Sequence, residues 1–179
     1  RDPLRRRFAC FLLVLALGAA ALAPTRAGAQ TVDEVVRLKT RGEVEQAYWL
    51  VRPATPVRVV AVLFTGGYGL LKLRATDSGV VWDREGSSYL VLNKDLFVDG
   101  ETAVALIDVP SDQWNFGYTP RFRKSAAHAV DVAAVVGDLR RRFAQARIFL
   151  VGTSQGTTSA AYAGKALGQD IDGVVLTAS

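Results

Sequence analysis

The stretch that decides the fold runs from Arg147 to Ala160 and reads RIFLVGTSQGTTSA. Its first part, residues 148–151, is apolar with β-branched and aromatic members, which is typical of a strand buried in a sheet. The pattern G-x-S-x-G follows at residues 152–156. The next segment, residues 157–167, is rich in small residues and contains no proline, so we expect a helix packed closely on the sheet.

A serine placed between a strand and a helix in this pattern has a defined chemical use. On such a sharp turn Ser154 takes a strained backbone conformation, and its Oγ points clear of the sheet. Gly152 and Gly156 remove the side chains that would collide there. The backbone N–H of Gln155 faces the same space and can stabilise an oxyanion. The pattern therefore predicts a nucleophile, although an ordinary strand-to-helix turn with two glycines is the alternative.

A second glycine-rich loop follows another buried strand. Residues 57–64 (VRVVAVLF) are almost wholly apolar, and Thr65-Gly66-Gly67-Tyr68-Gly69 comes directly after them. Glycines permit unusual dihedral angles and let backbone N–H groups converge. No G-x-x-x-x-G-K-[ST] pattern is present, so the sequence does not indicate a P-loop. A flexible turn is the alternative to a binding loop.

The remaining segments alternate between strand and helix patterns. Residues 32–39 and 44–51 flank the turn signal Thr40-Arg41-Gly42 and predict an antiparallel hairpin. Further along we expect a loop at 52–56, an irregular or hairpin-like excursion at 71–83, a helix at 87–98, a strand at 102–109, an aromatic loop at 111–120, a long helix at 124–143 and a last strand at 171–178. This order predicts an α/β fold with a mostly parallel sheet and helices on both faces. Ligands bind such sheets at the carboxyl ends of the strands, so both glycine loops should border one cleft.

The charge is concentrated at the N-terminus. The chain has 179 residues, which suggests one domain, and a net charge of +5. Five arginines and one aspartate lie within residues 1–29, so the charges of the remainder are nearly balanced. We therefore expect no nucleic-acid partner.

Residues 1–29 have the organisation of a signal peptide. Arg5-Arg6-Arg7 precedes the uncharged segment 8–23, and Ala27-Gly28-Ala29 offers a cleavage site before Gln30. A retained membrane anchor is the alternative, but the apolar run is shorter than the ~20 residues of a membrane-spanning helix. We therefore expect a periplasmic or secreted protein without stable membrane association after cleavage. The sequence does not distinguish Sec from twin-arginine export.

Cysteine and histidine are too scarce for a metal site. The single cysteine, Cys10, lies in the signal segment, and the chain has one histidine. Zinc and similar metals are usually held by clusters of these residues. We expect neither a metal nor a cofactor.

The order of strand, glycine loop, strand and nucleophile turn resembles the α/β-hydrolase superfamily. The resemblance covers most of residues 30–179 and implies a small-molecule acyl substrate, such as an ester, with Ser154 as the nucleophile. It also implies that N–H groups of Gln155 and of Gly67 or Tyr68 form the oxyanion hole. In the family the loop after this strand usually reads HGGG, whereas here it reads Thr65-Gly66-Gly67-Tyr68, so that Thr65 stands in place of the histidine. Residues 106–112 (LIDVPSD) also resemble a segment of exported bacterial hydrolases of unassigned substrate.

The resemblance breaks down after the nucleophile. In the family the acid and then the histidine follow the serine, but no histidine lies between Ser154 and Ser179. We therefore expect an incomplete α/β-hydrolase domain whose C-terminal part, with base and acid, lies beyond Ser179, and little turnover from these residues alone. Asp170 and Asp172 precede the last strand, whereas the family acid follows a later one. His128 falls in the long helix, where a structural role is expected.

Other polar and aromatic residues fall near the expected cleft. Asp108 and Asp112 could border it, although a turn or helix cap is the preferred role for Asp112. Trp114, Phe116 and Tyr118 either line a substrate entrance or cover an edge of the core.

The sequence thus predicts a serine hydrolase, with a non-catalytic binding module of the same fold as the alternative. It does not distinguish ester, lactone, thioester and peptide substrates, and it says nothing of the oligomeric state.

Overall fold

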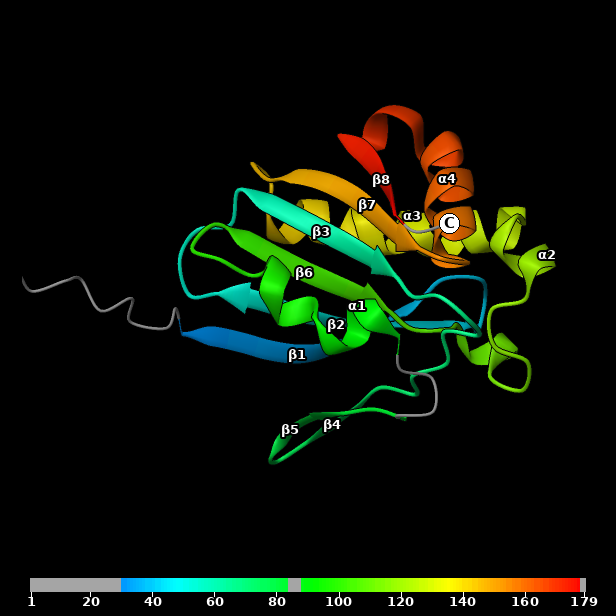
Figure 1. Ribbon diagram of the computed structural model, residues 1–179, viewed down its shortest axis with the longest axis horizontal. Helices are drawn as coiled ribbons and strands as arrows, with labels where there is room; N and C mark the ends of the chain where they lie inside the picture. Colours follow the sequence, from blue (N-terminus) through cyan, green and yellow to red (C-terminus); the bar gives the residue numbers. More distant parts are fainter. Residues whose placement is uncertain (1–29, 84–87, 178–179) are drawn as a thin grey trace, which may run out of the picture.

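The computed structural model describes residues 30–83 and 88–177. Its centre is a six-stranded sheet with the strand order β1-β2-β6-β3-β7-β8, and a separate two-stranded hairpin, β4-β5, lies next to β1 (Figure 1). The proposed signal segment lies outside the described residues. So do Ser87, the first residue of the helix predicted at 87–98, and Ala178, the last residue of the strand predicted at 171–178.

The N-terminal hairpin is confirmed. β1 (Thr31–Lys39) pairs antiparallel with β2 (Glu45–Pro53). The loop predicted at 52–56 starts later than expected, because β2 continues through Pro53, which pairs with Thr31. On its other side β2 pairs with β6 only over Tyr48–Val51. Pro53 therefore lies beyond the part of β2 where a missing N–H would break the ladder with β6.

Four parallel strands form the rest of the sheet. They are β3 (Val59–Phe64), β6 (Thr102–Ile107), β7 (Arg147–Thr153) and β8 (Gly173–Thr177). β3 lies between β6 and β7, and Phe64 at its end is in register with Gly152 of β7. The two glycine loops therefore leave neighbouring strands at the same edge of the sheet.

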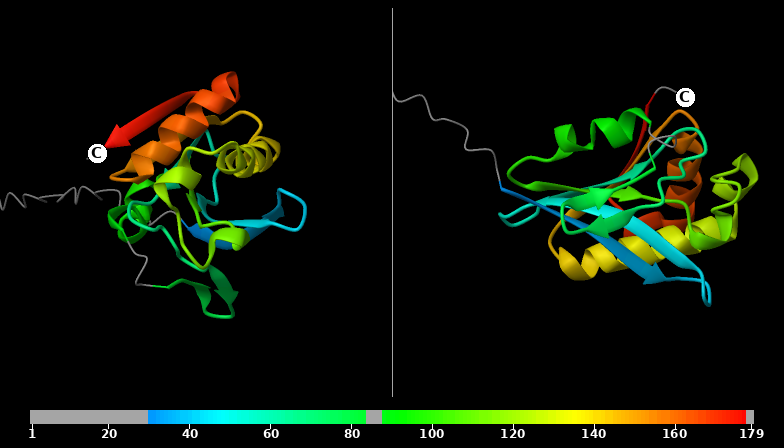
Figure 2. Two further views of the ribbon diagram at one scale, coloured as in Figure 1. Left: turned by 90° about the vertical axis from the view of Figure 1, so that its right-hand side faces the viewer. Right: turned by 90° about the horizontal axis from the view of Figure 1, so that it is seen from below.

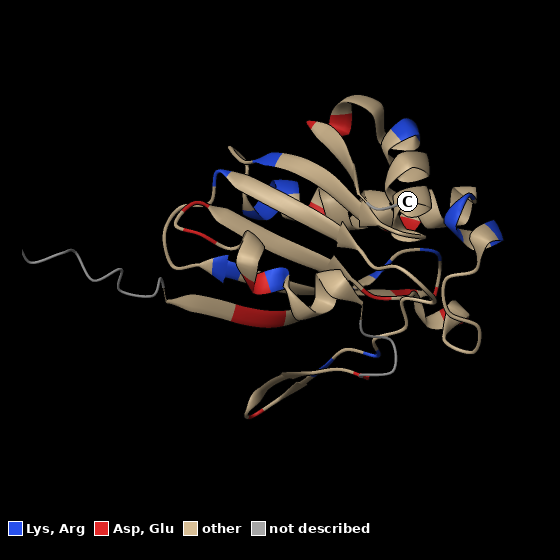
Figure 3. Ribbon diagram, viewed as in Figure 1, with Lys and Arg blue, Asp and Glu red and all other residues tan. Residues whose placement is uncertain are grey.

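Helical segments cover both faces of the sheet, as predicted (Figure 2). α3 (Ala126–Arg142) and α4 (Gly156–Leu167) pack on one face, and α1 (Tyr89–Leu92) and η2 (Lys94–Phe97) lie on the other. Alternate residues of β3 supply the two cores: Val60, Val62 and Phe64 face α3 and α4, and Ala61 and Leu63 face α1. Charged residues lie at the sheet's margins, while β3 and β6 carry none (Figure 3).

The prediction of one continuous helix over 87–98 is wrong. α1 ends at Leu92, because the backbone of Asn93 (φ −113°, ψ 13°) leaves the helical region and its Nδ2 donates to Tyr89 O at 2.8 Å. Such local side-chain bonds compete with helix continuation. The chain then resumes as η2, where the buried Lys94 ammonium lies 4.0 Å from the centre of the Trp49 ring.

The other connections are short. The predicted excursion forms β4 (Arg74–Thr76) and β5 (Gly79–Val81). Three short elements, η3 (Ser111–Gln113), α2 (Pro120–Arg123) and η4 (Gly168–Asp170), complete the chain. Of the helices in the described residues, none combines the length and apolar character needed to cross a membrane.

Candidate functional site

Ser154 occupies a sharp turn between β7 and α4. Its φ is 49°, in the left-handed region that non-glycine residues rarely adopt, and its side chain is exposed. Both flanking glycines are required by close contacts: a Cβ on Gly152 would collide with the Gly156 carbonyl, and a Cβ on Gly156 with the Phe64 carbonyl. Thr157 steadies the turn by donating its N–H to Ser154 O at 3.0 Å. The local geometry is the one predicted from the G-x-S-x-G pattern.

The glycine loop after β3 lies directly beside this serine. A Cβ on Gly66 would lie 3.1 Å from Ser154 Cβ and 3.6 Å from Ser154 Oγ. Gly67 (φ 56°) and Gly69 (φ 62°) adopt left-handed conformations that glycine tolerates best. Gly67 and Tyr68 are exposed, as is Gln155 on the other loop. The structure therefore brings the predicted site residues together at one edge of the sheet.

Free backbone donors are available in both loops. Within residues 30–83 and 88–177, the N–H groups of Gly67, Tyr68 and Gln155 donate to no protein acceptor. Backbone N–H groups without an internal partner are the usual donors of an oxyanion hole. The arrangement can stabilise negative charge that develops on an oxygen next to Ser154.

The carbonyl side of the glycine loop is held by a residue that sequence reasoning missed. Arg123 donates to Thr65 O at 3.0 Å and to Gly67 O at 2.8 Å. Tyr118 donates its N–H to Tyr68 O at 2.7 Å. An arginine at the end of a four-residue helix carries no sequence signal for this contact, since the loop it supports lies far away in the chain.

His128 is a core residue and does not serve as a base here. Its side chain is fully buried, and its ring contacts the rings of Phe64, Tyr118 and Phe122. Burial, aided by the positive charges of Arg123 and Arg41, lowers the pKa of His128 to about 3. A general base must take up a proton, which this environment opposes. The expected structural role is confirmed.

Asp108 supports the backbone and is not a free acid at the cleft. It is buried and accepts N–H bonds from Leu71 at 2.8 Å, Leu73 at 2.9 Å and Val109 at 2.7 Å. Burial raises the pKa of Asp108, while these N–H donors act in the opposite direction. Its occupied oxygens hold the chain at Lys72, whose φ is 48°.

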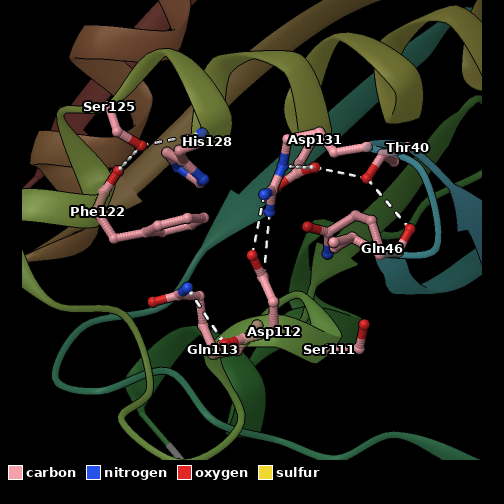
Figure 4. A network of polar contacts seen from close by, with 12 residues as sticks. Thr40, Gln46, Ser111, Asp112, Gln113, Phe122, Ser125, His128 and Asp131 are labelled. Atoms are coloured by element: carbon pink, nitrogen blue, oxygen red, sulfur yellow. Dashed lines mark hydrogen bonds and ion pairs between the residues drawn. The ribbon is translucent and has the colours of Figure 1, made fainter.

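Asp112 lies in the short turn η3, where its carboxylate forms an ion pair. Its carboxylate accepts two bonds from Arg41, at 2.9 and 3.1 Å. Arg41 also binds Asp131 on α3, so one arginine joins the β1–β2 turn, η3 and the long helix (Figure 4). The predicted turn is therefore present, but the carboxylate does not cap it and binds Arg41 instead, which comes within reach only in the folded chain.

The three aromatic residues of the loop at 111–120 differ in burial. Tyr118 is buried and covers the core, while Phe116 is 68% exposed and Trp114 36%. Trp114 Nε1 donates to Val109 O at 3.0 Å. Phe116 is thus the most exposed of the three side chains, and a role for it at a substrate entrance stays a prediction.

The acidic residues before β8 lie away from Ser154. Asp172 accepts the Ile148 N–H at 2.7 Å and pairs with Arg140, near the beginning of β7, whereas Ser154 follows the end of that strand. Across the described ranges, no group of three or more His, Cys, Asp and Glu side chains is arranged to hold a metal ion.

Solved structures resemble this chain over most of its length. A cold-adapted esterase from an Arctic intertidal metagenomic library is 19% identical, with a TM-score of 0.57, and the match covers 82% of this chain and 60% of that one. Brefeldin A esterase, described as a bacterial homologue of human hormone-sensitive lipase, is 19% identical, with a TM-score of 0.55, and the match covers 84% of this chain and 40% of that one. An α/β serine hydrolase without a lid from Xanthomonas campestris is 17% identical, with a TM-score of 0.52, and the match covers 80% of this chain and 60% of that one.

No protein-family model and no curated protein sequence matches the chain. The chain spans less than two thirds of the length of these three structures. Their likeness is one of fold. The chain therefore has an α/β-hydrolase fold.

Proposed function

We propose that the full-length protein is an exported serine hydrolase that cleaves an ester or related acyl bond of a small molecule. The observation that carries the proposal is the position of Ser154, which stands at φ 49° with Gly66 packed against it. Similar solved structures are those of esterases and a serine hydrolase, which supports the same reaction class.

In this mechanism the Ser154 Oγ attacks the acyl carbonyl and loses its proton to a base. The carbonyl oxygen becomes an oxyanion that accepts hydrogen bonds from Gln155 N–H and from Gly67 or Tyr68 N–H. Collapse of this intermediate breaks the acyl–oxygen bond, and the base returns its proton to the leaving oxygen, which releases the alcohol. Water, deprotonated by the same base, then hydrolyses the acyl-enzyme, which releases the carboxylic acid and restores Ser154 Oγ–H. Loss of one oxyanion donor typically lowers kcat by about 10²–10³-fold.

The base and acid are proposed to come from residues that follow Ser179. His128 is the only histidine of the sequence, and it is buried in an apolar cage. Asp108 and Asp112 are occupied by backbone donors and by Arg41. None of the three is therefore available to activate Ser154.

A fluorophosphonate probe on the full-length protein tests the proposal. We expect covalent labelling of the wild type at Ser154 and none in Ser154→Ala. Ser78→Ala removes an exposed serine of the β4–β5 turn and is the matched control, which should label like the wild type. A folded wild-type protein that does not label would contradict the proposal and favour a non-catalytic binding module.

A further inference from the structure

We propose that Arg123 is a positioning residue that fixes the glycine loop at residues 65–69 in the orientation needed to bind the oxyanion. The inference rests on the proposed function, because it concerns the loop that would supply one of the oxyanion donors. It assigns a role to a side chain that makes none of the bonds to the substrate itself.

The contacts of Arg123 join three separate segments. One terminal nitrogen, Nη2, donates to Thr65 O at 3.0 Å and to Gly67 O at 2.8 Å. The other, Nη1, donates to Ser159 Oγ at 2.7 Å. Ser159 lies on α4, the helix that begins directly after the Ser154 turn. Arg123 therefore connects the glycine loop to the helix that carries the nucleophile.

The environment of Arg123 is unusual for a cation. The side chain is 1% exposed, and within the described ranges it has no carboxylate partner. Its guanidinium lies 4.6 Å from the centre of the Tyr118 ring, and burial lowers its pKa to about 10. Buried charges are expensive, and apolar residues of similar size are often more stable in such places. The bonds from Nη1 and Nη2 and the contact with the Tyr118 ring offset part of this cost, while the buried Nε has no hydrogen-bond partner within the described ranges.

The carbonyl bonds also determine where the N–H groups point. Every peptide bond of the described residues is trans, so each N–H points opposite to the carbonyl of the same peptide. Because Gly67 O faces Arg123, the N–H of Tyr68 is turned away from Arg123. The Gly66 carbonyl, which shares a peptide with the Gly67 N–H, accepts no bond within the described ranges. Of the two loop donors, Tyr68 N–H is the one that Arg123 orients.

Part of the loop at residues 65–69 is closely packed against its neighbours. A Cβ on Gly69 would lie 2.6 Å from Thr65 Oγ1 and 2.9 Å from the Tyr118 ring. A Cβ on Gly117 would lie 2.7 Å from Tyr68 O. The loop is thus closely packed against Tyr118 and the Ser154 turn at Gly66 and Gly69, while Gly67 and Tyr68 between them are exposed and are held through the Arg123 and Tyr118 bonds to their carbonyls.

Steady-state kinetics of the full-length protein with a p-nitrophenyl ester tests the role of Arg123. We expect Arg123→Met to lower kcat by about 10²–10³-fold with little change in KM, since the lost interaction acts in the transition state. Arg123→Lys keeps the charge and can still donate to a loop carbonyl, so it should retain more activity. Each variant is assayed where circular dichroism shows it to be folded.

Arg140→Met is the matched control. Arg140 also donates to backbone carbonyls, Ala146 O at 2.7 Å and Asp170 O at 3.0 Å, but near the opposite end of β7. We expect this variant to lose stability and keep the wild-type kcat. If Arg123→Met does not fold, Arg123→Lys and Ser159→Ala, which each remove part of the contacts, carry the comparison.

The outcomes separate the two proposals. An active wild type with an unchanged kcat in the folded Arg123 variants overturns the role of Arg123 and leaves the serine hydrolase intact. The same holds if the Arg123 and Arg140 variants lose activity only in proportion to their stability. A folded wild type that neither labels nor hydrolyses esters overturns the proposed function, and this inference with it.

Discussion

Gly66 packs directly against Ser154, so that a Cβ on Gly66 would lie 3.1 Å from the Ser154 Cβ. The two residues follow different strands, β3 and β7, which are neighbours in the sheet with Phe64 in register with Gly152. The proposed nucleophile and the proposed oxyanion loop are thus held together by strand pairing as well as by their own contacts.

Gly66→Ala should impair catalysis more than stability. Its φ lies outside the left-handed region, so alanine is tolerated by the backbone, but the new methyl group would press on the Ser154 Cβ and on Thr153 O at 3.4 Å. We expect kcat to fall at least about ten-fold, or ~1.4 kcal/mol of transition-state stabilisation. Ester hydrolysis by the full-length variant measures this.

Gly168→Ala is the control for that variant. Gly168 has a φ of 55° with open space around it, so alanine there should lower the free energy of unfolding by about 1 kcal/mol and leave kcat unchanged. Equal losses of stability in the two variants, with no loss of activity in Gly66→Ala, would show that the contact with Ser154 is unimportant.

Arg41→Met should destabilise the fold strongly. Arg41 binds Asp131, whose side chain is fully buried, and removal of one partner leaves an unpaired buried charge. The remaining bond from Thr40 Oγ1, at 2.6 Å, compensates in part. We expect the free energy of unfolding to fall by about 3 kcal/mol. Urea unfolding followed by circular dichroism gives the value.

Asp112→Ala removes the other carboxylate that Arg41 binds. That side chain is 33% exposed, so the ion pair is screened by solvent and should contribute less than about 1 kcal/mol. If both variants lost the same stability, burial of Asp131 would not be the deciding factor.

His128→Leu should make the protein less sensitive to acid. The folded protein binds a proton at His128 with a pKa of about 3, while the ordinary value is 6.5. Between these values the unfolded chain binds more protons than the folded one, so stability falls as the pH decreases from about 6.5 towards about 3. One such group contributes a slope of up to about 1.4 kcal/mol per pH unit.

Urea titrations of the wild type and of His128→Leu at several pH values between 7 and 4 measure this slope. We expect the difference in the free energy of unfolding between the two proteins to shift in favour of the variant as the pH falls. A pH-independent difference would mean that His128 takes up a proton in the folded protein. The variant should still react with the fluorophosphonate probe, since the ring is not the proposed base.

Export should remove residues 1–29. We expect mass spectrometry of the protein from its native host to give an N-terminus at Gln30, because Ala27-Gly28-Ala29 precedes it. Replacement of Ala27 and Ala29 by bulky residues should leave the longer chain in the membrane fraction. Recovery of the unprocessed wild-type chain from the cytoplasm would rule out export.

Much of the fold follows from local patterns in the sequence. The apolar runs of β3, β6 and β7 identify buried strands, because a strand covered on both faces must be apolar at nearly every position. The G-x-S-x-G pattern identifies the Ser154 turn, since only glycine fits where Gly152 and Gly156 meet neighbouring carbonyls. The helix at 87–98 was not predicted correctly, because its apolar spacing does not reveal how Asn93 bonds to Tyr89.

The amino-acid sequence by itself determined most of the elements, their order and the serine that the turn presents. Only the tertiary structure decided that β3 lies between β6 and β7, which brings Gly66 to Ser154, and that Arg123 reaches the carbonyls of Thr65 and Gly67. Local patterns report what each segment's backbone and burial require. Strand order and the partner of a buried arginine depend on contacts between distant parts of the chain, which exist only once it has folded.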